Sequence, residues 1–272
     1  MSVTKLAKQR GQILDEIMAH HREQLPKIMR GTPFEDLRAF AQVAPKPLDF
    51  YAALKKPGVS LIAECKKASP SKGLMVPKYD AVRFAKLYES AGASAISVLT
   101  DARHFQGSLE DLRDVKESVK IPVLRKDFMF DPYQIYEARV AGADCILLIA
   151  AVLSKNEMAS LLKLTHKLGM NALIEVHTEA ELELVLTLNP KIVGVNNRNL
   201  QTFEVDFENT ARLRQRIPED IVVVGESGLK TEADVQKMAE IGVDAILVGE
   251  TLVKSKDVKK TAVSFVKAGR AK

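Results

Sequence analysis

The 272-residue sequence predicts an α/β protein, a (β/α)8 TIM barrel over residues 59–272 that follows an N-terminal helical extension over residues 1–58. Two patterns carry this prediction. After residue 58, short apolar runs alternate with amphipathic stretches of about 10–15 residues, as in βα units around a parallel sheet. In addition, a glycine that suits the left-handed end of a helix precedes an apolar strand start in AGASAIS (91–97), AGADCIL (141–147), LGMNALI (168–174) and IGVDAIL (241–247).

The apolar runs supply eight candidate strands. They cover residues 59–67, 95–101, 122–128, 145–151, 171–177, 191–197, 221–227 and 245–250. Eight such units close into a barrel. An open doubly wound sheet is the alternative, but the glycine fingerprint GxGxxG that often accompanies it is absent from the sequence. The strand count therefore favours the barrel.

Residues 1–58 do not follow this repeat. Apolar residues at helical spacing (Leu6, Ile13, Leu14, Ile17 and Met18) predict a first helix over about residues 4–21. Prolines at 26, 33, 45 and 47 are then expected to break the chain into short pieces. No low-complexity linker follows, so we expect the extension to pack on the barrel within one structural domain.

Composition narrows the classes of function. Apolar residues make up 46% of the chain, and no run approaches the ~18 residues of a membrane span. The net charge of +5 is spread without a basic run, which argues against nucleic acid and suits a small anionic substrate. Cys65 and Cys145 lie in apolar runs, as expected in a reducing cytoplasm. The histidines lack metal-ligand spacing, so we expect no metal. We also expect no cofactor and no obligatory protein partner.

Polar residues recur at the carboxyl ends of the predicted strands. Alternation along a strand places Glu64 and Lys66 on one face, and it places Lys126, Glu175, Asn196, Arg198 and Glu226 on the same face as an apolar residue earlier in their strands. In barrel enzymes this end carries the active site. An ion-pair network is the structural alternative for any one residue, but burying so many charges is costly unless they are paired or used.

The last two strands lead into glycine turns, in GESGLK (225–230) and LVGETL (247–252). Backbone N–H groups in such turns approach a phosphate closely, and barrels commonly bind phosphate after strands seven and eight. The pair of turns therefore indicates a phosphate site.

The stretch AECKKASPSKG (63–73) resembles the signature of the indole-3-glycerol-phosphate synthase family. The similarity covers essentially the whole chain and continues through SVLTDARHFQGS (97–108), LRKDFMFDPYQIYEA (124–138), LLIAA (147–151), LIEVH (173–177), GVNNRNL (194–200) and VGESGL (224–229). The resemblance implies a (β/α)8 barrel with extra helices at its start. It also implies a carboxy-lyase of tryptophan biosynthesis.

The reaction implied by the resemblance closes a ring. The substrate, 1-(o-carboxyphenylamino)-1-deoxyribulose 5-phosphate, becomes indole-3-glycerol phosphate, carbon dioxide and water. Lys126 is then the first choice for the acid that protonates the developing alkoxide. Lys66 is expected to hold the substrate carboxylate and to take part in closure. Dehydration needs an acid and a base, and either Glu175 with Lys66 or Glu175 with Lys126 divides that work.

The resemblance assigns further roles. Glu64 orients and charges the lysines, and Asn196 bonds substrate hydroxyls or holds Glu175. Arg198 and Glu226 line the mouth, and Ser69 lies near the substrate carboxylate. The residues expected around the aromatic ring are Phe105, Phe128, Leu147, Ile149 and Leu200. The residues expected around the phosphate are Lys66, Ser227, Gly228, Gly249 and Glu250, the last through its backbone because its carboxylate repels the dianion.

Two other functions stay open at this point. A Schiff-base aldolase would use Lys126 as a nucleophile. A catalytically silent barrel would bind a phosphorylated metabolite for regulation, and it would be expected to have lost Lys66, Lys126 or Glu175, all of which are present.

Overall fold

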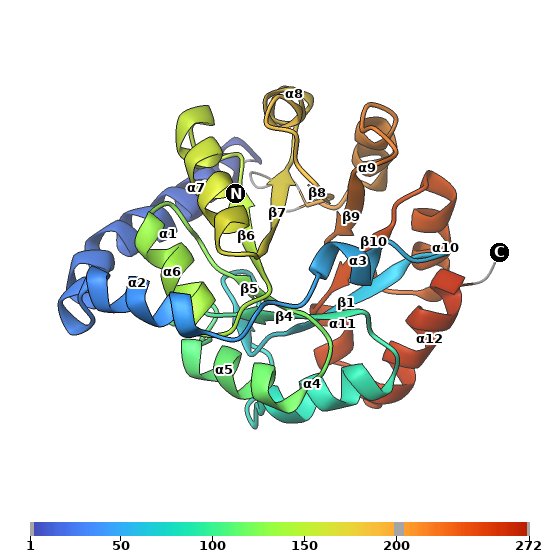
Figure 1. The fold of residues 1–272 in the computed structure, drawn as a ribbon. Coiled ribbons are helices and arrows are strands. Elements are labelled where there is room, and N and C mark those ends of the chain that lie inside the picture. Colours follow the sequence, from blue (N-terminus) through green and yellow to red (C-terminus); the bar gives the residue numbers. More distant parts are fainter. Residues whose placement is uncertain (1–2, 199–203, 271–272) are drawn as a thin grey trace.

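A closed barrel of parallel strands forms the centre of the molecule, with helices around it (Figure 1). The computed structural model describes residues 3–198 and 204–270, and residues 3–12 by their backbone alone. The barrel strands are β1 (Ser60–Cys65), β4 (Ala95–Leu99), β5 (Val123–Lys126), β6 (Cys145–Ile149), β7 (Asn171–Val176), β8 (Ile192–Asn196), β9 (Val222–Glu226) and β10 (Ala245–Val248). Each lies inside its predicted run, and β1 pairs with β10 to close the ring. The predicted (β/α)8 barrel is confirmed.

Helices connect the strands along the outside. They are α4 (Ala81–Ser90), α5 (Leu109–Ser118), α6 (Pro132–Val140), α7 (Lys155–Lys167), α8 (Glu179–Leu186), α9 (Phe207–Arg214), α10 (Glu232–Ile241), α11 (Glu250–Val253) and α12 (Val258–Arg270). Side chains such as Asp80, Ser154 and Thr231 cap their first turns by accepting backbone N–H bonds. The predicted helix-ending glycines have φ values of 92°, 89°, 81° and 86° at Gly92, Gly142, Gly169 and Gly242, which confirms the repeat.

Two apolar layers hold the barrel together. One lies between the strands and the outer helices, and it includes Cys65. The other fills the barrel interior with residues such as Ile62, Leu124, Cys145 and Leu173. Because strand residues alternate between these layers, the interior-facing set continues upward into the polar residues at the strand ends.

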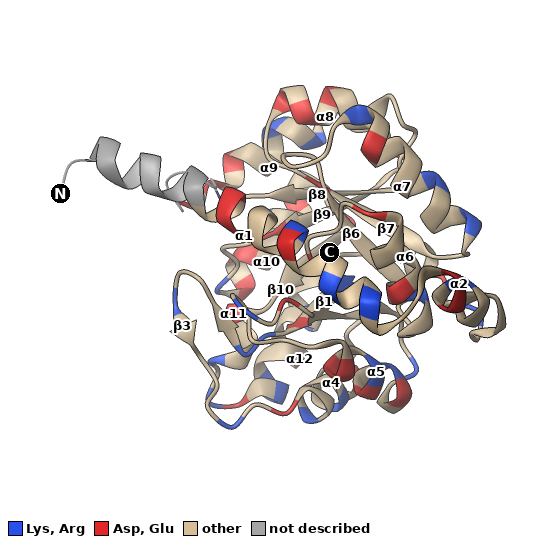
Figure 2. Cartoon of the chain, turned by 90° about the vertical axis from the view of Figure 1, so that its left-hand side faces the viewer, with Lys and Arg blue, Asp and Glu red and all other residues tan. Residues whose placement is uncertain are grey.

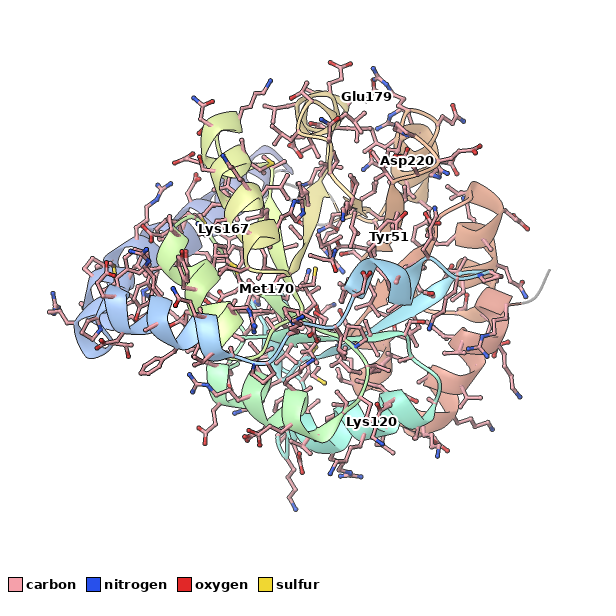
Figure 3. The ribbon with its side chains drawn as sticks, in the orientation of Figure 1. Tyr51, Lys120, Lys167, Met170, Glu179 and Asp220 are labelled. Atoms are coloured by element: carbon pink, nitrogen blue, oxygen red, sulfur yellow. The ribbon has the colours of Figure 1, made fainter. Side chains whose placement is uncertain are left out.

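A short helix that the sequence did not predict closes the amino-terminal end of the barrel. Phe50 and Leu54 of α3 (Phe50–Leu54) are fully buried and belong to the interior cluster. Tyr51 of the same helix, labelled in Figure 3, donates a hydrogen bond from its hydroxyl to the backbone carbonyl of Asp220 at 3.0 Å. With this end plugged, the opposite end is left for the site.

The first helix is longer than predicted. α1 spans Val3–Gly31 and contains Pro26, where a break was expected. That expectation was wrong because packing outweighs the hydrogen bond that proline removes: Leu25 is buried in a cluster with Leu37 of α2 (Phe34–Val43) and Tyr133 of α6. The division into residues 1–58 and 59–272 stays a prediction.

The loop after β1 forms a small hairpin of β2 (Ala68–Ser69) and β3 (Gly73–Leu74), which stands out from the barrel at the left of Figure 2. In the coloured ribbon of Figure 2, basic and acidic residues are intermixed along the outer helices. Within the described ranges, no helix is both long enough and apolar enough to cross a membrane.

Candidate active site

A cavity of about 700 Å³ opens at the carboxyl ends of the barrel strands. Its lining includes the polar residues that strand alternation predicted to converge: Glu64, Lys66, Lys126, Glu175, Asn196, Arg198 and Glu226. They come from β1, β5, β7, β8 and β9 and from the loops that follow β1 and β8. The closed barrel thus brings together side chains that lie up to 162 residues apart in the chain.

Glu64 and Lys66 form an ion pair on one wall. Lys66 Nζ lies 3.0 Å from Glu64 Oε1, and the Glu64 side chain is almost fully buried. Gly249, at the end of β10, provides the space for Glu64, since a Cβ atom built at Gly249 would overlap the Glu64 carboxylate. Packing against Glu64 therefore accounts for the glycine, and its phosphate contact stays a prediction.

Lys126 lies between two carboxylates. Its Nζ is 3.2 Å from Glu226 Oε2 and 3.7 Å from Glu175 Oε2. Both carboxylates are buried, Glu226 with 1% of its side chain exposed. Gly194 makes room for Glu226, because a Cβ atom there would overlap Glu226 Oε1. The ammonium and its two partners form one tightly packed charge cluster.

The charges of this cluster shift one another's pKa. Burial alone would lower the pKa of Lys126, but Glu226, Glu175 and Glu64 raise it above its ordinary value. Burial raises the pKa of Glu226 to about 7, with repulsion from Glu175 adding to the rise and Lys126 opposing it. For Glu175, attraction by Lys126 and His177 and the bond from Asn196 outweigh burial and lower the pKa. The cluster therefore contains an ammonium, an ionised carboxylate and a carboxyl group that titrates near neutrality.

Two polar residues hold Glu175 from the other side. Asn196 Nδ2 donates to Glu175 Oε1 at 3.2 Å, as one of the two predicted roles of Asn196 requires. His177 Nε2 lies 3.3 Å from the same oxygen, and His177 is not among the residues that line the cavity. The sequence analysis did not assign His177 to the site, although strand alternation places residue 177 on the same face as Glu175.

The apolar wall is formed largely as predicted. Phe105, Phe128, Leu147 and Ile149 line the cavity, and the ring centroids of Phe105 and Phe128 are 6.2 Å apart. Lys66 Nζ lies 5.6 Å from the Phe105 ring centroid. Leu200, the fifth predicted member, lies outside the described residues. Three residues of α1, Ile13, Leu14 and Ile17, also line the cavity, and the sequence analysis assigned them only to a helix face.

Four of the five residues predicted around the phosphate lie together at the ends of β9 and β10, and the fifth, Lys66, follows β1. Ser227, Gly228, Gly249 and Glu250 all line the cavity, as does Ser69. Ser227 and Gly228 have φ values of 67° and 86°, a left-handed turn. Glu250 Oε1 accepts a hydrogen bond from Lys254 Nζ at 2.8 Å. Three further lysines that the sequence analysis did not single out line the same end: Lys72, Lys230 and Lys254.

The described part of the chain contains no group of three or more His, Cys, Asp or Glu side chains arranged to hold a metal ion. Two ammonium groups of the cavity, those of Lys66 and Lys126, instead have carboxylate partners. Such an arrangement suits proton transfer to and from an organic substrate.

Known proteins resemble this chain over nearly its whole length. The family model for indole-3-glycerol phosphate synthase matches residues 14–265. The indole-3-glycerol phosphate synthase of Dehalococcoides mccartyi strain BAV1 is 49% identical over 250 residues, which covers 90% of this chain and 96% of the relative. That of Lacticaseibacillus casei is 46% identical and covers 93% and 98%, and that of Mycobacteroides abscessus is 45% identical and covers 95% of both chains.

Solved structures resemble the chain in fold. A 3-hexulose-6-phosphate synthase from Salmonella typhimurium superposes with a TM-score of 0.63 at 13% identity, covering 77% of this chain and 98% of the other. A thiamine phosphate pyrophosphorylase from Pyrococcus furiosus gives a TM-score of 0.60 at 14% identity, covering 77% and 95%. At this identity the likeness concerns the barrel alone.

Proposed function

Because the chain belongs to the indole-3-glycerol phosphate synthase family, we propose how its cavity residues divide the work of that family's reaction. The chain is a carboxy-lyase of tryptophan biosynthesis. It closes, decarboxylates and dehydrates 1-(o-carboxyphenylamino)-1-deoxyribulose 5-phosphate to indole-3-glycerol phosphate, carbon dioxide and water. The ring carbon that bears the carboxylate must attack a ketone, and the ketone oxygen must collect protons before it leaves as water.

Lys126 is the acid that protonates the ketone oxygen during ring closure. The observation that carries this assignment is the position of its ammonium, 3.2 Å from Glu226 and 3.7 Å from Glu175. These carboxylates keep the lysine protonated, as an acid must be and as a Schiff-base nucleophile must not. An alkoxide is far more basic than an amine, so the ammonium still gives up its proton as the alkoxide forms.

Lys66 holds the substrate carboxylate. It is paired with Glu64 and lies above the ring of Phe105. An aromatic ring bearing a carboxylate fits a site in which an ammonium meets an apolar wall. Loss of carbon dioxide leaves the bonding electron pair on the ring and restores its aromaticity.

Glu175 and Lys126 divide the dehydration. Glu175 takes the proton from the methylene carbon next to nitrogen, and Lys126 protonates the departing hydroxyl. The support is proximity, since the pair is 3.7 Å apart and Glu175 is ionised by its neighbours. Asn196 orients the Glu175 carboxylate through the bond to Oε1.

The phosphate binds where β9 and β10 end. Ser227 and Gly228 present a left-handed turn there, and Lys230 and Lys254 add positive charge to the same end of the cavity. Glu250 is drawn to Lys254, which supports its contributing only backbone to the ligand. The substrate thus lies with its carboxylate near Lys66 and Ser69 and its phosphate near Gly228 and Gly249, and Arg198 lines the cavity near its hydroxyls.

We place the enzyme in the cytoplasm, acting on this anionic small molecule without a cofactor, a nucleic acid, a membrane or an obligatory protein partner. Cys65 and Cys145 are both free thiols in buried positions, which suits a reducing compartment. In the view of Figure 2, basic and acidic residues are mixed along the outer helices, which supports a partner other than nucleic acid.

Replacing Lys126 tests the central assignment. Lys126→Ala removes a donor that acts only in the transition state, so kcat should fall by about 10²–10⁴-fold while KM changes little. Lys126→Arg is the matched variant, because it keeps the charge but does not surrender its proton near neutrality, and it should be equally slow. Steady-state kinetics with indole fluorescence measures both. A variant that turns over normally with a raised KM would make Lys126 a binding charge and pass the acid role to Lys66.

A further inference from the structure

The reaction consumes a proton that must come from solvent. The substrate arrives with an ionised carboxylate that leaves as neutral carbon dioxide. The ketone oxygen gains two protons before it departs as water, and the methylene carbon returns only one. One proton per turnover is therefore taken up.

A chain of titratable side chains runs from the charge cluster away from the cavity. Glu175 is contacted from behind by His177, whose Nε2 is 3.3 Å from Glu175 Oε1. The other ring nitrogen, Nδ1, is 3.6 Å from Glu181 Oε2. His177 is 9% exposed, whereas Glu181, on the first turn of α8, is 22% exposed and reaches water.

The two ring nitrogens of His177 are buried, and neither is hydrogen-bonded to any residue that the structure describes. A buried imidazole without partners is costly unless it is used. Each nitrogen nevertheless faces one carboxylate, at 3.3 Å for Nε2 and 3.6 Å for Nδ1, so each pair needs a better alignment of the ring rather than a large movement to become a hydrogen bond. The ring is thus placed as a bridge between an interior and an outer carboxylate.

We propose that Glu181 and His177 relay a proton from solvent to Glu175, and through Glu175 to Lys126. The inference rests on the proposed function, because it takes Lys126 as the acid that acts twice. Lys126 gives its first proton to the alkoxide. The relay returns one proton to Lys126, which then protonates the departing hydroxyl, and the proton that Glu175 removes from the methylene carbon recharges Lys126 at the end. Two protons are given and two are regained.

The electrostatics of His177 suit this role. Burial would lower its pKa, but the carboxylates of Glu181 on α8, Glu175 on β7 and Glu226 on β9 raise it above the ordinary value of 6.5. The imidazole therefore takes up a proton more readily than an ordinary histidine side chain. Glu181 also accepts the backbone N–H of His177 at 2.7 Å, which is a purely structural role at the start of α8. Glu181→Gln retains that acceptor and removes only the ability to carry a proton.

Single-turnover kinetics separates the relay from the chemistry that precedes it. Enzyme in excess is mixed with substrate at pH 8, above the value of about 7 to which burial raises the pKa of Glu226, so that Glu226 is ionised and supplies no proton. Release of carbon dioxide reports ring closure, which uses the first proton of Lys126. Indole fluorescence reports dehydration, which needs the relayed proton.

In His177→Gln, carbon dioxide release should keep the wild-type rate while indole formation slows by about tenfold or more, less than the ~10²-fold or greater loss of a direct acid. Glu181→Gln should slow the same step. In His177→Ala, added imidazole should restore indole formation in proportion to its protonated fraction. The matched controls are Glu183→Gln on α8, whose partner is Arg216, and His166→Gln on α7, and both should behave as wild type.

Indole formation at the wild-type rate in His177→Gln would overturn the relay, as would equal slowing of both steps or a loss that imidazole does not restore. The proposed function fails by a different result. If Lys126→Ala releases carbon dioxide at the wild-type rate, Lys126 is not the acid. If that variant is inactive while His177→Gln is normal, only the relay is wrong.

Discussion

Gly194 leaves the space that the Glu226 carboxylate occupies, and its replacement should show how tightly the charge cluster is packed. In Gly194→Ala the added Cβ overlaps Glu226 Oε1 and lies 3.2 Å from Leu173 Cδ1. Overpacking a buried site typically costs ~1–3 kcal/mol, so the melting temperature and kcat should both fall. Gly31→Ala is the control, because nothing lies within 4 Å of its Cβ position. A Gly194→Ala enzyme with wild-type stability and rate would show that Glu226 has room to move.

The raised pKa of Glu226 predicts how stability changes with pH. Below the ordinary value of 4.5, the carboxyl group is protonated whether the chain is folded or not, and its contribution to stability is complete. As the pH rises toward about 7, the folded protein keeps a proton that the unfolded chain has lost, so this contribution declines. At ~1.4 kcal/mol per pKa unit, the whole loss is on the order of 3 kcal/mol.

Glu226→Gln should remove this pH dependence. The free energy of unfolding of the variant, minus that of wild type, should increase as the pH rises from 5 to 8. Urea titrations at several pH values measure it, with Glu183→Gln, an exposed carboxylate paired with Arg216, as the control. A difference between variant and wild type that is flat across this range would mean that Glu226 is ionised throughout.

Single residues also show how much of the site could be predicted from the sequence. Lys66, Lys126 and Glu175 were predicted to meet because strand alternation and strand polarity are local rules. The contacts of His177 with Glu175 and Glu181 were not predicted, because the spacings of two and four residues do not by themselves indicate a site. The space behind Gly194 likewise exists only once β8 and β9 are paired.

At the scale of elements, an ion-pair contact holds α1 against the barrel, close to the cavity that three residues of α1 line. His21 Nε2 lies 2.9 Å from Asp101 Oδ2 and 3.7 Å from Asp127 Oδ1. Burial and Arg125 act to lower the pKa of His21, but the two aspartates outweigh them and raise it. Its contribution to holding α1 is therefore complete below pH 6.5 and declines as the pH rises through the higher, folded value.

This fastening predicts a pH-dependent local opening of α1. Amide hydrogen exchange of residues 13–25, corrected for the intrinsic rate, should quicken between pH 6 and pH 8, and peptides from α12 serve as the internal control. His21→Gln should exchange faster at pH 6 and lose the difference between the two pH values. Protection of α1 that does not depend on pH in the wild type would contradict a charged His21.

Elements differed in how well the sequence predicted them. The strands were placed within a few residues because apolar runs bounded by turns are a strong local signal. The length of α1 was underestimated because Pro26 looked like a stop, whereas burial of Leu25 against α2 and α6 decides the outcome. The plug helix α3 was missed because five residues, Phe50–Leu54, show no helical period.

At the scale of the whole molecule, one closed end and one open end determine where chemistry occurs. α3 fills the amino-terminal end of the barrel with Phe50 and Leu54, and the interior above it is apolar up to the level of the charge cluster. The charge cluster lies above this apolar interior, in surroundings that contain less water than the protein surface. Electrostatic interactions between its charges and a substrate are therefore stronger than they would be at the surface. The closed barrel thus brings residues from strand ends that are far apart in the sequence into one cavity, where they form the proposed acid, base and anion site.

The most direct measurement of this arrangement is a crystal structure of the protein with a substrate analogue whose ketone is reduced to an alcohol. The analogue keeps the carboxylate and the phosphate of the substrate and lacks the electrophilic carbonyl carbon, so it cannot close the ring and should persist in the crystal. We expect its alcohol oxygen, which stands for the ketone oxygen, within hydrogen-bond distance of Lys126 Nζ, its carboxylate at Lys66 and its phosphate at Gly228 and Gly249. An analogue bound in the reverse direction, with this oxygen away from Lys126, would contradict the assignment of Lys126 as the acid.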